Sequence, residues 1–263
     1  MPTPLEIILD PISLTAIGIY VALILWEALA PARELPRMKG WRTKTLASFG
    51  VYFMLSSYLP LLWDGWLAEF RLIDLTGIGV TGGVIFGLLV YELVGYAYHR
   101  SLHASDTLWR FVHQVHHSAE RLDTFSAFWF SPLDMAGWTA VSSFALVLVL
   151  GIQPMAATII ILLLMLMGIF QHANIRTPQW LGYFVQRPES HTIHHGKGLH
   201  RYNYADLPLI DMIFGTFRNP KGYEMETGFY QGASNRVLSM LAGHDVSRAK
   251  PVATDQQARV TVV

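Results

Sequence analysis

The chain has 263 residues, of which 52% are hydrophobic and only 14% are charged, against roughly 25% charged residues in a typical soluble domain. Its formal net charge is zero and no basic cluster is interleaved with aromatic residues, so we expect no nucleic-acid partner. With no cysteine, the chain cannot form disulfides, zinc-thiolate sites or iron-sulfur clusters. The apolar residues are gathered into long blocks, which predicts membrane spans.

The apolar blocks predict four to five spans or hairpins. Residues 12–26, with a weaker flank from residue 5, reach the ~20 residues needed to cross a bilayer. The segment before them has no basic region, so it does not read as a cleaved signal peptide. Two further blocks cover residues 46–63 and 75–98, the second interrupted only by Glu92.

The fourth block, residues 136–170, contains no charged residue. Its 35 residues are too long for one helical crossing of ~30 Å at 1.5 Å per residue. Gly151-Ile152-Gln153-Pro154 divides the block into halves that are short for spans. Two full crossings and a hairpin that only dips into the membrane are therefore equally compatible with it.

Residues 77–83, GIGVTGG, match the G-x-G-x-x-G pattern of dinucleotide-binding sites. That pattern binds a pyrophosphate between a strand and a helix of a soluble unit, whereas this one lies in an apolar block. Gly83 and Gly87 have the G-x-x-x-G spacing of closely packed membrane helices. We therefore predict helix packing here and no nucleotide site.

The distribution of Lys and Arg predicts the orientation. If each block crosses once, residues 31–45, 99–135 and those after 171 share one face, and 18 of the 19 Lys and Arg residues lie there. Only Arg71 lies on the other face. Because an excess of Lys and Arg marks the cytoplasmic side, we predict that this face is cytoplasmic. It also carries all ten histidines between residues 99 and 200.

Eight histidines occur at helical spacings on this face, and a ninth stands alone. YHRSLH holds an i, i+4 pair, FVHQVHH and HTIHH each hold an i, i+3, i+4 triplet, and QHAN adds a single histidine. We expect a short helix within residues 104–120, with Ser105 or Asp106 as its N-cap, and another from Pro188 to about Gly196, so that each triplet forms one three-pronged face. The nine are His99, His103, His113, His116, His117, His172, His191, His194 and His195.

Clustered imidazoles favour a metal site. A lone histidine at a membrane surface is usually an ordinary polar residue, and this interpretation suits His200 and His244 taken alone. Nine partly buried imidazoles, in contrast, cost stability through desolvation and repulsion unless a cation organises them. Imidazole binds iron, zinc, copper and nickel well. Nine ligands exceed the capacity of one ion, so we predict two ions with four or five ligands each.

Other histidine-based sites are excluded by missing motifs. No histidine is followed by glutamate, so there is no H-E-x-x-H protease motif. The Glu-x-x-His motif of soluble carboxylate-bridged di-iron bundles is also missing.

The three boxes HRSLH, HQVHH and HTIHH, in this order and with the apolar hairpin between the second and third, resemble the fatty acid hydroxylase superfamily, a membrane di-iron group that includes the sterol desaturases. The resemblance covers roughly residues 80–220 and extends to RFVHQVHHSAERLD, SPLD, QHANI and NYADLPLIDMIFGTF. It implies that the nine histidines hold two iron ions and that dioxygen is the co-substrate. NYAD, where relatives have Asn-Tyr-Gly, and Gly196 depart from the pattern, but neither removes a ligand.

The expected fold is all-α, a multi-pass membrane helical bundle with a cytoplasmic helical cap that carries a histidine-rich di-metal site. We expect an N-terminal membrane region (1–75), a catalytic region (76–222) and a C-terminal cytoplasmic extension (223–263) with a mobile tail from about Ser247.

The expected function is O2-dependent hydroxylation or desaturation of a lipid such as a sterol or fatty acid. No cytochrome-like domain is fused to the chain, so we expect electrons from a separate protein, either a ferredoxin or a cytochrome with its reductase. The alternatives are a transporter or metal-handling protein with a histidine-lined site, and a haem electron carrier, which the clustering outside the spans disfavours. The sequence carries no signal for oligomeric state.

Polar residues near the boxes are candidates to support them, because ligating imidazoles usually donate their other N–H to a carboxylate or carbonyl. His200 is also a candidate tenth ligand, and aromatic residues near the second box are candidates to line a lipid tunnel. Glu27 and Glu92 are candidates because they are ionisable groups within spans. The supporting candidates are His200, Asn174, Asn203, Glu189, Asp211, Glu120, Asp123 and Asp206; the aromatic candidates are Phe125, Trp129, Phe130 and Trp138.

Overall fold

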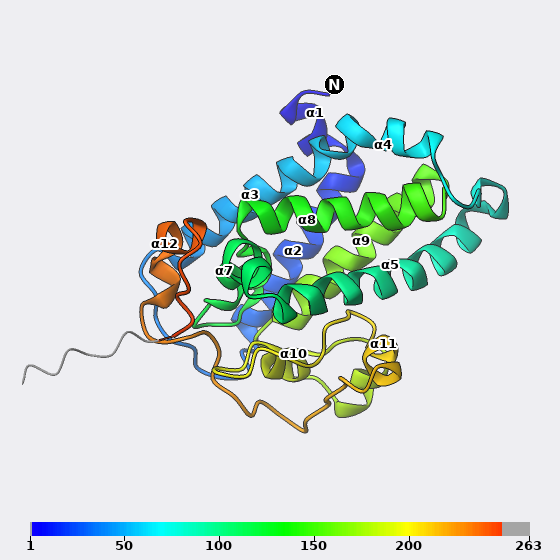
Figure 1. Ribbon diagram of the computed structural model, residues 1–263. Helices are drawn as coiled ribbons and strands as arrows, with labels where there is room; N and C mark the ends of the chain where they lie inside the picture. The colour runs from blue at the N-terminus through cyan, green and yellow to red at the C-terminus, as the bar shows by residue number, and fades with distance from the viewer. Residues whose placement is uncertain (1, 249–263) are drawn as a thin grey trace, which may run out of the picture.

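The computed structural model describes residues 2–248, and regular structure there is helical apart from an isolated β-bridge between Gly196 and Thr227 (Figure 1). The predicted mobile tail falls, beyond residue 248, outside the described residues. The α-helices are α1 (Pro4–Leu9), α2 (Pro11–Leu29), α3 (Trp41–Tyr58), α4 (Pro60–Glu69), α5 (Gly79–Ala104), α6 (Asp106–Leu108), α7 (Gln114–His117), α8 (Pro132–Ser143), α9 (Pro154–His172), α10 (Pro188–His194), α11 (Pro208–Ile213) and α12 (Val237–Leu241). Short 3-10 helices cover Thr76–Ile78, Thr124–Phe128, Gln179–Tyr183 and Ala233–Asn235, and π-helical turns cover Trp109–His113 and Phe144–Val149.

Within residues 2–248, five helical segments are long and apolar enough to cross a membrane, which confirms the prediction of an all-α, multi-pass membrane protein. They are Pro11–Leu29, Trp41–Glu69, Thr76–Ala104, Pro132–Val149 and Pro154–His172. The second segment starts earlier than the apolar block 46–63 and is divided at Pro60 into α3 and α4. Proline lacks the N–H that a continuous helix needs, so a new helix begins there.

The charge-free block folds as two helices of span length. They contain 18 and 19 residues, or about 27 Å and 28 Å at 1.5 Å per residue. The first starts at Pro132, capped by the Ser131 hydroxyl, and takes the buried Asp134 into its first turn, so it begins before the uncharged block does. Gly151, with φ of +50°, turns the chain between the two helices. Each helix is therefore long enough for a full crossing.

The central contact of the bundle joins α5 and α9. A Cβ atom added at Gly83 would lie 2.8 Å from Ala156 Cβ, and one at Gly87 would lie 2.5 Å from Ile160 Cδ1. Only glycine allows the two backbones to approach this closely. The prediction that this G-x-x-x-G serves helix packing is confirmed.

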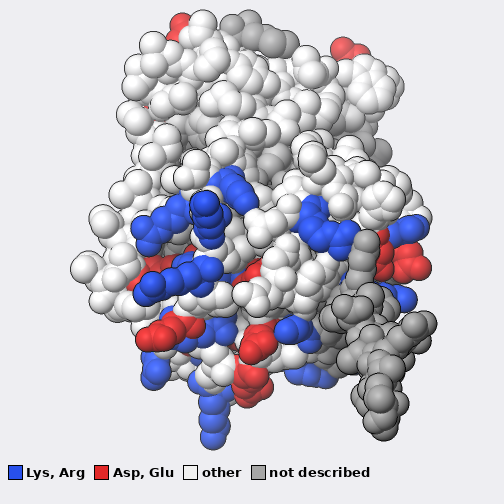
Figure 2. Space-filling model, turned by 90° about the vertical axis from the view of Figure 1, so that its left-hand side faces the viewer, with Lys and Arg blue, Asp and Glu red and all other residues white. Residues whose placement is uncertain are grey.

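The connecting segments and short helices form a cap at one end of the bundle, where α7, α10, α11 and α12 lie (Figure 1). Figure 2 shows that Lys and Arg gather on the lower half of the molecule in that view, while the upper half is almost uncharged. The helix expected within residues 104–120 is capped by Ser105 but is interrupted by the π-helical turn at Trp109–His113. That the cap is cytoplasmic stays a prediction.

Two acidic residues within spans, Glu27 and Glu92, connect the bundle to this cap. Glu27 Oε2 accepts hydrogen bonds from the backbone N–H groups of Thr124 and Asn174. Glu92 Oε2 accepts from those of Asp206 and Leu207, each at 3.0 Å. Each carboxylate therefore joins a helix that reaches the cap to a loop of the cap.

Candidate metal centre

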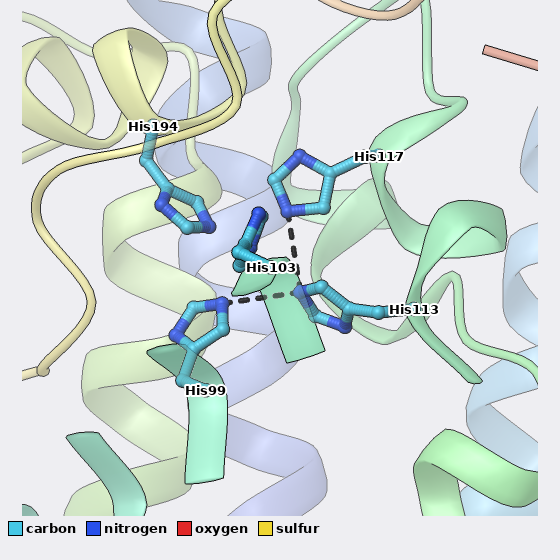
Figure 3. Close-up of side chains that lie close together, drawn as sticks. All are labelled: His99, His103, His113, His117 and His194. Carbon is cyan, nitrogen blue, oxygen red and sulfur yellow. Dashed lines mark hydrogen bonds between the residues drawn. The ribbon is translucent and has the colours of Figure 1, made fainter. Parts of the chain in front are cut away.

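The nine histidines meet at the cap end of the bundle in two groups whose potential ligand atoms lie within 4.8 Å of one another. All are buried except His103, which is half-buried. Figure 3 shows the rings of the first group pointing toward a common centre. The first group is His99, His103, His113, His117 and His194, and the second is His116, His172, His191 and His195.

Helical spacing explains how the boxes divide between the groups. Each i, i+4 pair lies on one helix face, so 113 and 117 share the first group and 191 and 195 share the second. The i+3 residue of each triplet points differently: His116 joins the second group and His194 joins the first. The expectation that each triplet forms a single face is therefore wrong, because each triplet joins the two groups.

The spacing of the ring nitrogens fits metal binding. In the first group His113 Nε2 lies 3.1 Å from His99 Nε2 and 3.2 Å from His117 Nε2 (Figure 3). Nitrogens bound about 2.1 Å from one ion at octahedral or tetrahedral angles lie about 3.0 to 3.4 Å apart. The second group has the same spacing: the Nε2 atoms are 3.3 Å apart for 116 and 172, 3.3 Å for 172 and 191, and 3.1 Å for 191 and 195.

The imidazoles are kept in the neutral form that binds metals. Burial lowers the pKa of the histidines outside the spans well below its usual value of 6.5, and the neighbouring rings lower it further. At neutral pH each ring therefore has one unprotonated nitrogen for a cation. These residues are His116, His117, His191, His194 and His195.

Four rings are oriented by an acceptor at Nδ1, which leaves Nε2 free to face the centre. His99 Nδ1 donates to the Tyr204 carbonyl at 2.7 Å and His194 Nδ1 to the Tyr202 carbonyl at 2.8 Å. His113 Nδ1 donates to Asp134 Oδ2 at 2.8 Å, and His172 Nδ1 to the Gly168 carbonyl, four residues earlier in its own helix, at 2.7 Å.

The loop that supplies two of these carbonyls is held in a strained shape. His200, Tyr202 and Asn203 have φ of +44°, +69° and +50°, and no other non-glycine residue of the described chain has a positive φ. Such conformations persist only where surrounding contacts enforce them. Asp211 provides such contacts, accepting from the N–H groups of Tyr204 and Ala205.

The supporting residues expected from the sequence act on the backbone. Asn203 donates to the Ser190 and Arg218 carbonyls, Asn174 donates to the Arg33 carbonyl, and Glu189 accepts from Thr177. Among the described residues, none of Asn174, Asn203, Glu189 and Asp211 is hydrogen-bonded to an imidazole ring.

The other three acidic candidates also bind elsewhere. Glu120 accepts from Ser234, Asp123 from Trp41 Nε1 and Arg121, and Asp206 from Gln171.

Asp134 is the carboxylate that does accept from an imidazole, and sequence reasoning did not select it. The available signal was its place in SPLD, an acidic residue in the first turn of a helix that follows the second box. The Tyr202 and Tyr204 carbonyls have no comparable signal, because every residue has a carbonyl.

His200 lies behind the first group, outside both. Its Nδ1 is 3.2 Å from His117 Nδ1, whereas His117 Nε2 faces His113. Burial lowers the pKa of His200 to about 4, so it is a neutral neighbour of His117. The geometry places it beside a candidate ligand and not among the ligands.

A cavity of about 360 Å³ runs from the histidines into the bundle. Rings of both groups line one end, and side chains of α2, α3, α4, α5, α8 and α9 line the remainder. Along α9 the lining extends from His172 to Ala157, about 22 Å at 1.5 Å per residue. Of the aromatic candidates, Phe130 and Trp138 line the cavity, whereas Trp129 and Phe125 belong to a separate hydrophobic cluster. The histidines lining it are His99, His113, His116, His172 and His191.

Comparisons with known proteins agree with this site. A family model described as fatty acid hydroxylase matches residues 84–216. The chain is 33% identical over 147 residues to the ornithine lipid hydroxylase OlsE of Rhizobium tropici, covering 52% of this chain and 42% of that protein. It is 29% identical over 179 residues to the Delta(7)-sterol-C5(6)-desaturase of Nicotiana tabacum, covering 63% of this chain and 60% of that protein. The chain thus spans about half the length of these relatives, and no solved structure matches it significantly.

Proposed function

Because the chain belongs to the fatty acid hydroxylase family, we propose that it is a membrane-bound oxidoreductase that uses dioxygen and external electrons to hydroxylate or desaturate a lipid, with its nine histidines binding two iron ions. The five-histidine group would hold one ion and the four-histidine group the other. The family match lies within residues 76–222, the region that we assign to catalysis.

The observation that carries this proposal is the continuity of the cavity with both histidine groups. A lipid tail can enter an apolar cavity between spans without leaving a hydrocarbon environment, and the reacting carbon then lies beside the imidazoles. The acyl chains of one leaflet of a bilayer fill about 15 Å of hydrocarbon. The cavity lining along α9 is longer, at about 22 Å, so the cavity can hold a long acyl chain. Phe49 and Tyr52 of α3 also line the cavity, so the first 75 residues help to shape it.

The bound iron pair would supply the oxidising power to attack an unactivated C–H bond with dioxygen. The protein residues have other tasks. The Tyr202 and Tyr204 carbonyls and Asp134 hold imidazoles in the orientation that exposes Nε2. The apolar walls position the chain and exclude water from the reacting carbon.

The two relatives carry out different reactions, one named a hydroxylase and the other a desaturase. Both reactions begin with removal of a hydrogen atom from a C–H bond, so one site can serve either. From the positive-inside rule we expect the charged cap and the candidate centre to lie on the cytoplasmic face, where a soluble electron carrier can reach them.

The test is to purify the protein with iron, supply a chemical reductant, isotopically labelled dioxygen and a membrane lipid extract, and analyse the lipids by mass spectrometry. We expect two irons per chain, one for each histidine group, and a lipid that gains labelled oxygen or a double bond. His113→Ala should lower the iron content of the first group and abolish the lipid change, whereas the exposed His244→Ala should alter neither. An iron-loaded parent protein that alters no lipid would overturn the proposal.

A further inference from the structure

Three arginines lie in or near the strained loop at the candidate metal centre, each stacked on a tyrosine ring. The guanidinium carbon of Arg100 lies 5.9 Å from the Tyr96 ring centroid. Those of Arg201 and Arg218 lie 5.3 Å and 4.2 Å from the Tyr202 ring centroid. All three arginines are exposed. We call Arg100, Arg201, Arg218 and Tyr202 the arginine surface.

The positive charge of this surface is not neutralised within the described chain. None of the three guanidiniums lies within 4.0 Å of a carboxylate oxygen there, whereas nearby Lys197 pairs with Glu226 at 3.5 Å. Two guanidiniums on one tyrosine ring repel each other. A surface of this kind is completed by an anionic partner.

The surface is also connected to the candidate centre by a short path. The Tyr202 carbonyl accepts from His194 Nδ1 at 2.8 Å, so one residue separates the two guanidiniums from a ring of the first group. Arg100 directly follows His99 and donates a hydrogen bond to the Tyr96 hydroxyl. That hydroxyl is also hydrogen-bonded to the Thr216 hydroxyl, two residues before Arg218. The three charges therefore belong to one region over the five-histidine group.

We propose that the arginine surface is the docking site for an acidic, one-electron carrier protein that reduces the metal centre. This inference rests on the proposed function, which requires external electrons. Each docking event would transfer one electron from the carrier to one of the two iron ions that the histidines would hold, so two events would be needed to reduce the pair. An anionic lipid headgroup is the alternative partner. Binding a headgroup would not require the connection from the surface through Tyr202 to His194, whereas electron transfer would use it.

Binding of a plant-type [2Fe–2S] ferredoxin, an acidic carrier, to the full chain in neutral detergent tests the proposal without dependence on activity. We expect each of Arg201→Glu and Arg218→Glu to weaken binding roughly tenfold, and the double variant to lose most of its salt dependence. For the parent, raising the ionic strength from about 0.01 M to about 0.15 M shortens the screening length from about 30 Å to about 8 Å and should weaken binding.

Arg42→Glu is the matched control. Arg42 is likewise exposed and stacked on an aromatic ring, 5.4 Å from the Phe125 centroid, but it lies at the start of α3, and within residues 2–248 neither Arg42 nor Phe125 is hydrogen-bonded to a histidine. It should leave binding within about twofold of the parent. Arg201→Gln provides a neutral variant, and Arg201 makes no side-chain hydrogen bond within the described chain that its loss would break.

Three results would overturn the proposal: no binding of ferredoxin to the parent, equal weakening by Arg42→Glu, or parent-like binding by the double variant. If the double variant binds ferredoxin normally but loses thermal stabilisation by anionic lipid in nanodiscs, the surface binds lipid. Lipid oxidation driven by a chemical reductant distinguishes a failure of the docking proposal from a failure of the proposed function. The double variant should still oxidise lipid under these conditions, because it loses only docking. If the parent protein oxidises no lipid, the result counts against the proposed function.

Discussion

His113 donates its Nδ1 hydrogen to Asp134 Oδ2 at 2.8 Å, and both side chains are buried. This bond joins the second histidine box to the first turn of α8, and it is the one contact between a carboxylate and a ring of the first group within residues 2–248. It fixes which nitrogen of His113 faces the two neighbouring rings.

Asp134→Asn should weaken metal binding by about 10- to 100-fold, because an amide oxygen accepts the hydrogen bond without the charge that makes the imidazole a stronger ligand. Metal titration of the apo protein measures it. Asp123→Asn is the control, since Asp123 is equally buried but contacts Trp41 and Arg121. Equal losses in the two variants would show a general effect of removing a buried carboxylate.

His172→Ala should lower the iron content from two ions per chain to one, because it leaves the second group with three histidines and the first group intact. Elemental analysis of the purified variant checks this. Loss of both ions would contradict independent binding by the two groups. His244→Ala, outside both groups, should retain both ions.

A chelator should remove the two ions in separate phases. The first group has five histidines, and the Nδ1 atoms of His99, His113 and His194 donate to hydrogen-bond acceptors. The second group has four histidines, and the Nδ1 atoms of His116, His191 and His195 have no hydrogen-bond partner within the described residues. We expect the four-histidine group to empty first, seen as an early phase in a chelation time course that His172→Ala lacks. A single phase in the parent would be inconsistent with this order.

Acid should destabilise the metal-free protein. The pKa of rings such as His194 is well below 6.5 in the folded state, while an unfolded histidine titrates near 6.5. Below that pH the unfolded chain binds more protons, so the free energy of unfolding falls as the pH drops from about 6.5 toward 4, and these groups contribute no slope above about pH 7.

Chemical unfolding of the apo protein at several pH values measures this slope. Each such histidine contributes up to about 1.4 kcal/mol per pH unit. His194→Gln should therefore reduce the slope by about one proton, and an unchanged slope would rule out His194 as a contributor.

Gly83→Ala should destabilise the bundle by about 1 to 3 kcal/mol, because the new methyl would lie 2.8 Å from Ala156 Cβ and force α5 and α9 apart. Gly18→Ala in α2 is the matched control, because apart from its chain neighbours and the backbone of its own helix no atom lies within 4 Å of the added carbon. Alanine there should be neutral or slightly stabilising, since it favours helix more than glycine does. Thermal unfolding of both variants in the same detergent decides, and equal midpoints would contradict the packing argument.

The sequence predicts what depends on side-chain type and spacing. The nine histidines, the spans and the packing role of Gly83 and Gly87 follow from such patterns, and the structure places the histidines together. The start of α8 was missed because a search for uncharged residues stops at Asp134, which is buried against His113. The acceptors at Tyr202 and Tyr204 are backbone atoms of a loop with positive φ, and only the folded chain determines where such atoms point.

Gln114, between the first two histidines of the second box, bonds with a segment made much later. Its side-chain amide donates to the Met240 and His244 carbonyls and accepts from the Val246 N–H, contacts that span 126, 130 and 132 residues. When the ribosome has just synthesised this box, it has not yet made the residues that hold Gln114 in place. During translation the box therefore lacks these three hydrogen bonds until residues 240–246 have been synthesised and have docked against it.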